Sequence, residues 1–417
     1  MPEHISDDAL FNDPEHLEFL GRQRKGLVDF VEPHVCSPDG GYTWIGDDGL
    51  PITSKGKQLW IGARMIHVFS LATMLGRPHA DDVVNHGLDF YVDGDGYDAS
   101  YGGWYTIVGG DTPSQEKELY GTAHMLLAGS SSTLAGFDRG RILLDRALDL
   151  LDTRYWDESI GRARESYDRT FTHLDDYRGQ NANMHLTEAF LAAYEATGDE
   201  KLLQRAVSIA RFIAGRAVLT EGEAPWRLPE HFDSSWTPLW DYNLDDKRHA
   251  FRPYGTQVGH WLEWAKLCIQ MHDLGADEPW LIPTAELLFR KGIEEGWAPT
   301  GGFYYTLDWD GQPIVSDKFF WSTAEAAGAA KLLWDATEDP YYARWYRTIW
   351  NFAREHFVSP DLGTWQHELD DDNRPTSITW QGRPDAYHVY QATLYPLLPR
   401  GKGVARWAAD TTEPYVS

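Results

Sequence analysis

The chain has 417 residues, of which 42% are hydrophobic and 24% are charged, and its net charge is −27. A chain this acidic is not expected to bind nucleic acid or an anionic membrane, because both partners are held by basic patches. The 19 Trp, 21 Tyr and 17 Phe residues offer flat apolar faces for a sugar ring, although such side chains also fill large cores. The composition therefore indicates a globular protein and favours a carbohydrate ligand only weakly.

The cysteine content and the first residues of the sequence indicate the cellular compartment. Only Cys36 and Cys268 occur, far apart in the sequence, which is typical of a reducing compartment and not of a disulfide scaffold. The acidic first residues contain no apolar run, so no signal peptide is expected. No apolar stretch reaches the 18 residues that a membrane span needs. These features predict a cytoplasmic protein.

Helical periodicity dominates the chain. Residues 139–153, for example, place Leu143, Leu144 and Ala147 on one face and charged residues on the other. The same periodicity predicts twelve helices, near residues 14–34, 55–76, 79–93, 114–136, 139–153, 180–197, 200–217, 255–274, 279–296, 320–337, 340–357 and 385–397.

Short glycine-rich segments separate these helices. Each consists of glycine, then aromatic or β-prone residues, then a turn, which predicts a short β-hairpin. Such segments start at Gly40, Gly102, Gly301 and Gly363, and Gly161 starts a shorter relative.

The recurrence of helices and hairpins, at intervals of about 50–70 residues, is typical of a repeat architecture. Six helix pairs that close into a ring form an all-α (α/α)6 barrel, with the hairpins gathered at one mouth. No low-complexity linker interrupts the series, so we expect a single domain over residues 1–417. Residues 217–254 lack a period and are predicted to form a long loop.

Polar residues lie within several otherwise apolar helices. Arg64 needs an acceptor from the protein or from a ligand if it is buried. Asn181, His185 and Glu188 lie four and seven positions apart, so they share one helix face. They could form a satisfied network between helices or line a site. In a helical ring, alternate helices form the inner wall, so we expect such residues to converge on one cavity.

Histidines and acidic residues occur together on later helices. His260 and Glu263 are one turn apart, and a carboxylate beside an imidazole holds its tautomer and raises its basicity. The spacing is not the His-Glu-x-x-His of zinc enzymes, so we predict no metal. Trp321 and Glu325 point the same way from one helix. His388 opens the last helix, where a lone histidine could equally be structural.

Taken together, these motifs resemble the N-acylglucosamine 2-epimerase superfamily, and within it the branch of mannose and sulfoquinovose isomerases. The resemblance runs from residue 60 to residue 388. It is carried by Arg64-Met-Ile-His67, Asn181-Ala-Asn-Met-His185-Leu-Thr-Glu188, Gly259-His260-Trp-Leu-Glu263-Trp264, Trp321-Ser-Thr-Ala-Glu325 and Tyr387-His388.

The resemblance implies an (α/α)6 barrel that uses no metal or cofactor. It implies that His260 and His388 carry proton transfer, and that Arg64 and His185 belong to the same site. We further expect the amide of Gln381 to bind a sugar hydroxyl. The residues implied to hold the sugar are Tyr120, Asn181, Glu263, Trp321, Glu325 and Trp380.

For an aldose–ketose isomerase, the chemistry runs through a cis-enediol. We expect His388 to move the proton between carbon 2 and carbon 1. His260, oriented by Glu263, would open the sugar ring, with assistance from His185. Arg64 would stabilise the enediolate oxygen.

The choice of substrate and reaction stays open at this point. The first choice is D-mannose to D-fructose, with D-lyxose to D-xylulose as a side activity, because the motifs hold no spare cation for a sulfonate. The alternatives are a mannose–glucose 2-epimerase, a sulfoquinovose isomerase, a glycoside hydrolase that uses Glu263 and Glu325, and a sugar-binding protein without activity.

Overall fold

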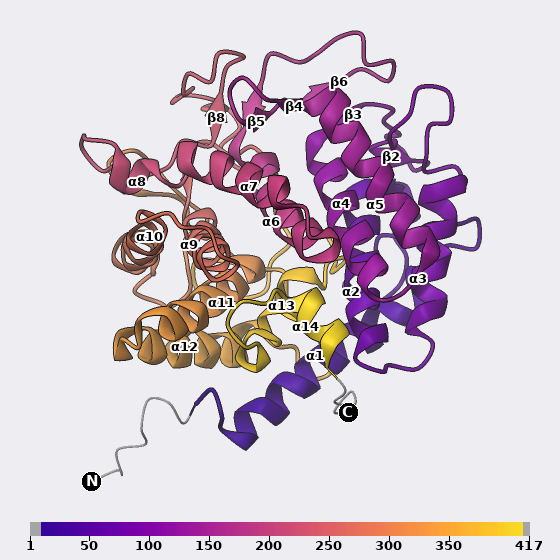
Figure 1. Cartoon of the computed structure of the whole chain (residues 1–417). Helices are drawn as coiled ribbons and strands as arrows, with labels where there is room; N and C mark the ends of the chain where they lie inside the picture. Colours follow the sequence, from indigo (N-terminus) through magenta and orange to yellow (C-terminus); the bar gives the residue numbers. More distant parts are fainter. Residues whose placement is uncertain (1–9, 412–417) are drawn as a thin grey trace.

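The computed structural model describes residues 10–411. Residues 1–9 and 412–417, at the ends of the predicted domain, lie outside the described residues. All twelve predicted helices are present, and two short ones, α8 and α14, are added (Figure 1). The helices are α1 (Pro14–Val35), α2 (Leu59–Met74), α3 (Ala80–Leu88), α4 (Leu119–Leu134), α5 (Asp138–Leu150), α6 (Gln180–Thr197), α7 (Glu200–Phe212), α8 (Arg216–Leu219), α9 (Val258–Asp273), α10 (Leu281–Gly296), α11 (Phe320–Thr337), α12 (Pro340–Phe352), α13 (Tyr387–Ala392) and α14 (Val404–Asp410).

The helices form a closed ring of six pairs. The inner helices α2, α4, α6, α9, α11 and α13 each pack against the next, and α13 returns to α2. The outer helices α3, α5, α7, α10, α12 and α1 pack on α2, α4, α6, α9, α11 and α13 in that order. The arrangement is the predicted (α/α)6 barrel.

The two layers differ in their residue patterns. Every residue of α2 from Leu59 to Ala72 is buried, as expected for a helix that is apolar all round. Helix α5 instead buries one stripe that includes Leu143 and Ala147, while Arg141 and Asp145 form an exposed ion pair. Because the whole helix is buried, its polar side chains must find partners inside the protein or face the barrel's interior.

Short strands join neighbouring repeats at the mouth where the inner helices begin. Five inner helices follow directly on a two-residue strand: β1 (Lys57–Gln58), β3 (Lys117–Glu118), β7 (Arg178–Gly179), β9 (Thr256–Gln257) and β12 (Lys318–Phe319). These strands pair antiparallel with β2 (Ile107–Val108), β6 (Ser166–Tyr167), β8 (His231–Phe232), β10 (Thr306–Leu307) and β13 (Glu368–Leu369), in that order. Two further pairs are β4 (Trp156–Asp157) with β5 (Arg162–Ala163) and β11 (Pro313–Val315) with β10.

The glycine-rich segments form turns at this mouth, as predicted. Backbone bridges Cys36–Tyr42, Tyr97–Trp104, Trp297–Phe303 and Val358–Trp365 close four of them. Both residues of the pair Gly40-Gly41 have positive φ angles, 88° and 69°, which glycine adopts without strain. The predicted loop over 217–254 is also confirmed, since only α8 and β8 interrupt it.

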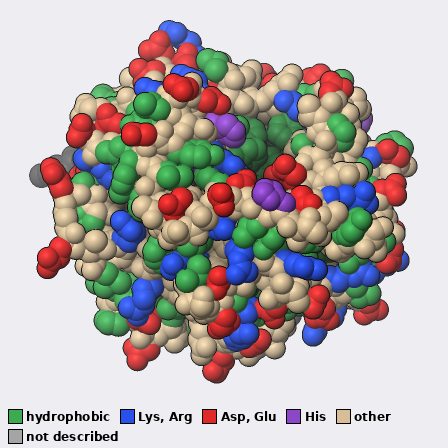
Figure 2. Space-filling model, turned by 90° about the horizontal axis from the view of Figure 1, so that it is seen from above, with side chains coloured by type: hydrophobic (Ala, Val, Ile, Leu, Met, Phe, Trp, Pro, Cys, Tyr) green, Lys and Arg blue, Asp and Glu red, His purple; other side chains and the backbone are tan. Residues whose placement is uncertain are grey.

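Figure 2 shows one face of the molecule, on which charged side chains of both signs are spread. There, acidic and basic side chains alternate, and a hollow with hydrophobic walls opens near the middle. Within residues 10–411, no helix combines the length and the apolar character needed to cross a membrane.

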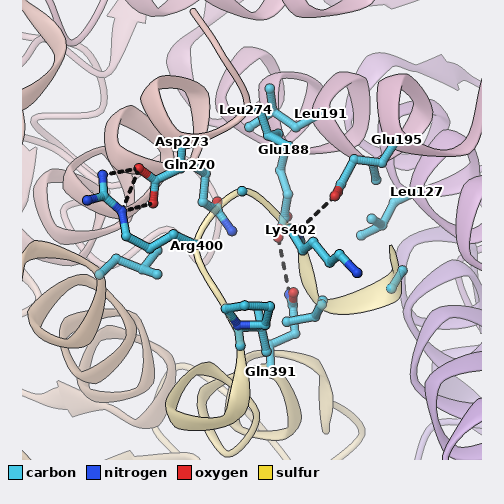
Figure 3. Close-up of a pocket in the computed structure, with 18 of the residues that line it drawn as sticks. Leu127, Glu188, Leu191, Glu195, Gln270, Asp273, Leu274, Gln391, Arg400 and Lys402 are labelled. Carbon is cyan, nitrogen blue, oxygen red and sulfur yellow. Dashed lines mark hydrogen bonds and ion pairs between the residues drawn. The ribbon is translucent and has the colours of Figure 1, made fainter. Parts of the chain in front are cut away.

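A cavity lies at the opposite, lower end, between the later turns of the inner helices (Figure 3). Residues 398–405 of the C-terminal segment cover it. Glu188 and Glu195 of α6 and Gln270 and Asp273 of α9 line it.

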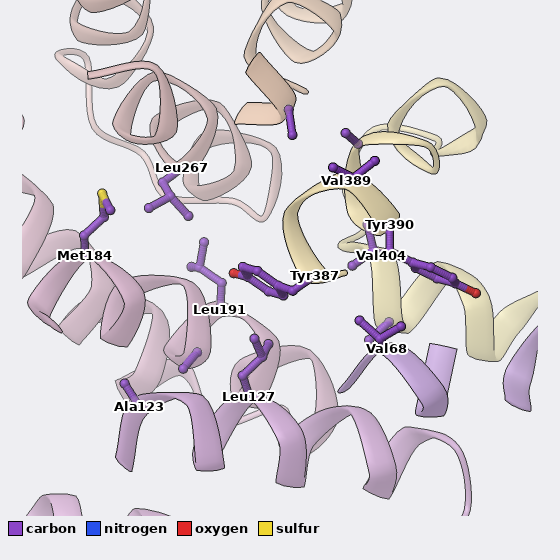
Figure 4. Close-up of a cluster of buried hydrophobic side chains, with 14 of the residues drawn as sticks. Val68, Ala123, Leu127, Met184, Leu191, Leu267, Tyr387, Val389, Tyr390 and Val404 are labelled. Atoms are coloured by element: carbon purple, nitrogen blue, oxygen red, sulfur yellow. The ribbon is translucent and has the colours of Figure 1, made fainter. Parts of the chain in front are cut away.

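The middle of the barrel is filled by side chains. Figure 4 shows Tyr387 of α13 among Leu127, Leu191 and Leu267, which point inward from α4, α6 and α9. All four residues are fully or almost fully buried. The two ends of the barrel therefore hold separate cavities.

Candidate active site

The upper cavity lies where the inner helices begin. It gathers polar side chains from the first turns of α2, α4, α6, α9, α11 and α13, as the ring arrangement predicts. Among the predicted site residues, the lining includes Arg64, Tyr120, Asn181, His185, His260, Glu263, Trp321, Trp380 and His388.

His260 is oriented by a residue that was not predicted from the sequence. Its Nδ1 lies 2.8 Å from Oε2 of Glu230, and both side chains are buried. Glu230 also accepts a hydrogen bond from the backbone N–H of Gln257, at 3.0 Å. The prediction that Glu263 orients His260 is therefore wrong: although the two residues are one turn apart on α9, the carboxylate on Nδ1 comes from the irregular segment before β8.

His388 is oriented in the same way. Its Nδ1 lies 2.7 Å from Oε1 of Glu325 on α11. An ionised carboxylate can only accept, so Nδ1 carries the proton and Nε2 is left free. Glu325 was predicted to contact the sugar, but it lies behind His388 and is not part of the cavity wall.

The indole of Trp321 lies next to both histidines. Its ring centroid is 5.4 Å from that of His260 and 5.9 Å from that of His388. Gly259 allows this packing, because a Cβ at that position would come within 2.3 Å of the indole. His260 and His388 therefore border one apolar platform, on which the face of a pyranose can stack.

Arg64 is buried and held on three sides. Its Nη1 donates to Asp385 at 2.5 Å, its Nη2 donates to the hydroxyl of Tyr120 at 3.0 Å, and its Nε donates to Nε2 of His124 at 3.1 Å. The other nitrogen of His124, Nδ1, donates to the carbonyl of Tyr120. The guanidinium is thus a fixed positive charge in the cavity wall, and Asp385 balances it.

Several polar atoms aimed at the cavity lack a protein partner. Among the described residues, none hydrogen-bonds to Nδ1 of His185, to either carboxyl oxygen of Glu263 or to Oδ1 of Asn181. His185 Nδ1 lies 3.7 Å from Glu263 and 3.8 Å from Glu188. Buried polar groups normally have partners, so this set is suited to binding a polyhydroxylated ligand.

Burial favours the neutral form of His185 and His388. It lowers the pKa of His185 to about 3, and it lowers the pKa of His388 well below its usual range, with Arg64 as the next cause. The pKa of Glu263 is raised well above its usual range by burial and by the nearby charge of Glu325. The cavity therefore presents two imidazoles biased toward their neutral form, His185 and His388, and a carboxyl group, Glu263, biased toward its protonated form.

Aromatic side chains form the outer part of the cavity. Phe251 packs edge-on against Trp380 and Trp60, with centroid distances of 5.1 Å and 5.7 Å. Trp44 stacks on Trp380 at 6.3 Å. Gln381, which was predicted to bind the sugar, is exposed outside this wall, and only its backbone carbonyl is used, by the indole N–H of Trp44.

The acidic residues do not fit a metal ion. The donor atoms of Glu263, Glu325 and His388 lie within 4.8 Å of one another, as do those of His185, Glu188 and Glu263. However, the ammonium of Lys266 lies 2.5 Å from Glu325 and 3.9 Å from Glu188. A cation would have to share these carboxylates with a fixed positive charge, which is electrostatically unfavourable.

Several cavity residues and one supporting residue were not predicted from the sequence. Asp385 is three positions before His388 and could have been found from that spacing. Glu230, the supporting residue, could not, because it lies in a segment without period. Other lining residues that were missed come from loops and strands at the mouth, and these include Phe251, Gln257, Tyr305 and His367.

The fold and the site together define a class: an (α/α)6-barrel protein whose inner wall holds carboxylate-backed histidines at one mouth. The sequence model of the N-acylglucosamine 2-epimerase (GlcNAc 2-epimerase) family matches residues 40–392. The chain therefore belongs to the N-acylglucosamine 2-epimerase family.

Relatives within this family are similar over most of the chain. A D-mannose isomerase of Thermobifida fusca is 42% identical over 398 residues, which cover 94% of this chain and 96% of that protein. A D-mannose isomerase of Pseudomonas cannabina pv. alisalensis is 35% identical, with 94% and 95% covered. A crystal structure of a D-mannose isomerase superimposes with a TM-score of 0.84 at 32% identity, over 91% of this chain and 97% of that one.

Proposed function

We propose that the protein is an aldose–ketose isomerase that interconverts D-mannose and D-fructose. The observation that carries the proposal is the pair of buried histidines, His260 and His388, each with a carboxylate on Nδ1 and each next to Trp321. A neutral imidazole with a fixed tautomer is suited to moving protons at neutral pH. Relatives that are D-mannose isomerases at 42% and 35% identity support this substrate.

In the proposed reaction, Nε2 of His388 takes the proton from carbon 2 of the open-chain aldose. The electrons form the carbon 1–carbon 2 double bond of a cis-enediol, and the carbonyl oxygen on carbon 1 gains a proton. His388 then returns its proton to carbon 1, while the hydroxyl on carbon 2 loses its proton and becomes the ketone. No external oxidant or reductant is needed.

The remaining residues have supporting roles. We assign ring opening to His260, oriented by Glu230. Arg64 stabilises the negative charge on the enediolate oxygen. His185 and Glu263 lie 3.7 Å apart and offer groups for exchanging protons between the two oxygens. Trp321 and Trp380 hold the sugar.

The other functions receive less support. A glycoside hydrolase needs two free carboxyl groups, but both oxygens of Glu325 are engaged, by His388 and by Lys266. A 2-epimerase would use the same histidines, and the relatives at 42% and 35% identity favour the isomerase. The two free thiols, Cys36 and Cys268, support the expectation of a cytoplasmic location.

Incubation with D-mannose in deuterated water, followed by NMR, tests the proposal. We expect fructose to be the first product, with deuterium at carbon 1 where the base exchanges with solvent. Glucose appearing first with deuterium at carbon 2 would favour the epimerase. Parallel incubations with sulfoquinovose and with a mannose disaccharide test for a sulfoquinovose isomerase and a glycoside hydrolase, and no change in any sugar would contradict an enzymatic function.

A further inference from the structure

Lys266 is a buried cation that the proposed reaction does not use. Its side chain is 0% exposed, on α9 two turns after the start of the helix. Its ammonium lies 2.5 Å from Oε2 of Glu325 and 3.9 Å from Oε1 of Glu188. It does not line the upper cavity, so it does not reach the substrate itself.

We propose that Lys266 is a positioning residue that keeps Glu325 ionised against Nδ1 of His388 and thereby leaves Nε2 of His388 as the base. The proposal rests on the proposed function for its kinetic consequence. Its structural consequence, the position of one proton on His388, can be observed without any substrate.

The geometry gives Lys266 this role through a single bridging carboxylate. Oε1 of Glu325 faces His388 Nδ1 at 2.7 Å, and Oε2 faces the ammonium. When Glu325 is ionised, it can only accept, so the imidazole proton stays on Nδ1. When Glu325 is protonated, it can donate to Nδ1, and the imidazole proton then moves to Nε2, where it blocks the base.

The surroundings make the charge state of Glu325 depend on Lys266. Burial raises the pKa of Glu325, and the largest opposing influence is the ammonium of Lys266. Burial works against that ammonium, but the attraction of Glu325, joined by Tyr395, Glu188 and Glu263, together outweighs it and raises the pKa of Lys266 well above its usual range. The charged and titratable groups that face this pair from the packed elements are Glu263, Glu188, His185, Arg64, Asp385, Tyr387, His388 and Tyr395.

Within this set, Lys266 is the cation in contact with Glu325, because Arg64 is engaged with Asp385 at 2.5 Å. Glu188 meets other donors, since the hydroxyl of Tyr387 and Nε2 of Gln391 both donate to it. Removal of the charge on Lys266 therefore leaves Glu325 as a buried carboxylate with a neutral imidazole as its partner. Such a group takes up a proton near neutral pH.

The test compares Lys266→Met and Lys266→Gln with the wild type. The methionine matches the shape of the stem, and the glutamine keeps a hydrogen-bond donor in case the methionine variant does not fold. The matched control is Lys331→Met on α11. Lys331 is also nearly buried and ion-paired, to Asp335, but it packs over Phe11 away from His388.

The first readout is the tautomer of His388 from ¹⁵N NMR of histidine-labelled protein, assigned by the loss of its signals in His388→Asn. We expect the Nδ1–H form in the wild type and in Lys331→Met between pH 6 and 9. In both Lys266 variants we expect the Nε2–H form at pH 7, with a return to Nδ1–H as the pH rises and Glu325 ionises.

The second readout is the pH profile of kcat for mannose. We expect kcat of the Lys266 variants to fall about 10–100-fold at pH 7, with KM nearly unchanged and partial recovery at higher pH. Glu325→Gln, which cannot ionise, should lose activity at every pH, and adding Lys266→Met to it should cost little more.

Folded Lys266 variants with the wild-type tautomer and the wild-type pH profile would overturn the proposal. A structural role alone would lower stability, as in Lys331→Met, without moving either readout. If the wild type did not convert mannose but the tautomer still changed as expected, the proposed function would fail while the role of Lys266 would stand.

Discussion

Each end of the barrel holds a cavity, but the carboxylates at the two ends have different partners. Below, each of the four lining carboxylates has a donor or a cation as partner. Glu188 accepts from Gln391, Glu195 accepts from the backbone N–H of Gly403, Asp273 pairs with Arg400, and Asp335 pairs with Lys331.

Above, carboxylates are used to orient other groups or are left without a partner. Glu230 and Glu325 each hold Nδ1 of a histidine, and Asp385 holds Arg64. Glu263 faces the cavity with no hydrogen-bond partner among residues 10–411. The two ends therefore differ in how they use buried charge, and the proposed function places its chemistry at the upper end.

The largest difference in activity is expected when one histidine is changed at each end of the barrel. We expect His388→Asn to lower kcat for mannose by about 10²–10⁴-fold, the usual contribution of a general base. His67→Asn is the matched variant, because His67 is equally buried but lines the lower cavity and contacts Ser131. It should keep kcat within about threefold and lower the stability alone.

Steady-state kinetics with mannose and urea unfolding of both variants measure these effects. A large loss of kcat in folded His67→Asn, or normal kcat in His388→Asn, would mean that the assignment of chemistry to the upper end is incorrect.

A smaller effect is expected from the carboxylate behind His260. Glu230→Gln retains the shape of the side chain but removes its charge, so Nδ1 of His260 loses its ionised acceptor. We expect kcat to fall about 10–100-fold with little change in KM. Glu295→Gln, which changes a carboxylate that pairs with Arg227 away from the cavity, serves as the control. Equal kcat in the two variants would show that Glu230 does not support catalysis.

The pattern of the helices made the barrel predictable. Mainly apolar helices such as α2 alternate with helices that have a single apolar face, such as α5. This alternation already specifies an inner and an outer layer. The site residues that lie on inner helices, such as Arg64, His185 and His260, followed from that placement, because a polar side chain there has few directions open to it.

The supporting contacts were not predictable, because they depend on how the repeats dock. Glu263 is one turn from His260, yet Glu230, thirty positions away in sequence, is the residue that contacts it. The resemblance implied that Glu325 is a sugar ligand, but Glu325 lies behind His388. A helix pattern gives the direction of a side chain and does not reveal the neighbour that separates it from the cavity. Gln381 lies in an irregular segment, where no period gives the direction.

The smallest effect is expected at the lower cavity. Arg400 donates to Asp273 at 2.6 Å, but its side chain is 46% exposed, and pairs of this kind contribute about 1 kcal/mol or less. We therefore expect Arg400→Ala to lower the free energy of unfolding by no more than about 1 kcal/mol and to leave kcat and KM for mannose unchanged. Urea unfolding and kinetics at the same pH measure both. Lys402→Ala, which removes an exposed pair with Asp410 next to the cavity, provides the control. If Arg400→Ala lowered kcat while its stability stayed normal, the covering segment would have to act on the catalytic end, and the two cavities could no longer be treated as independent.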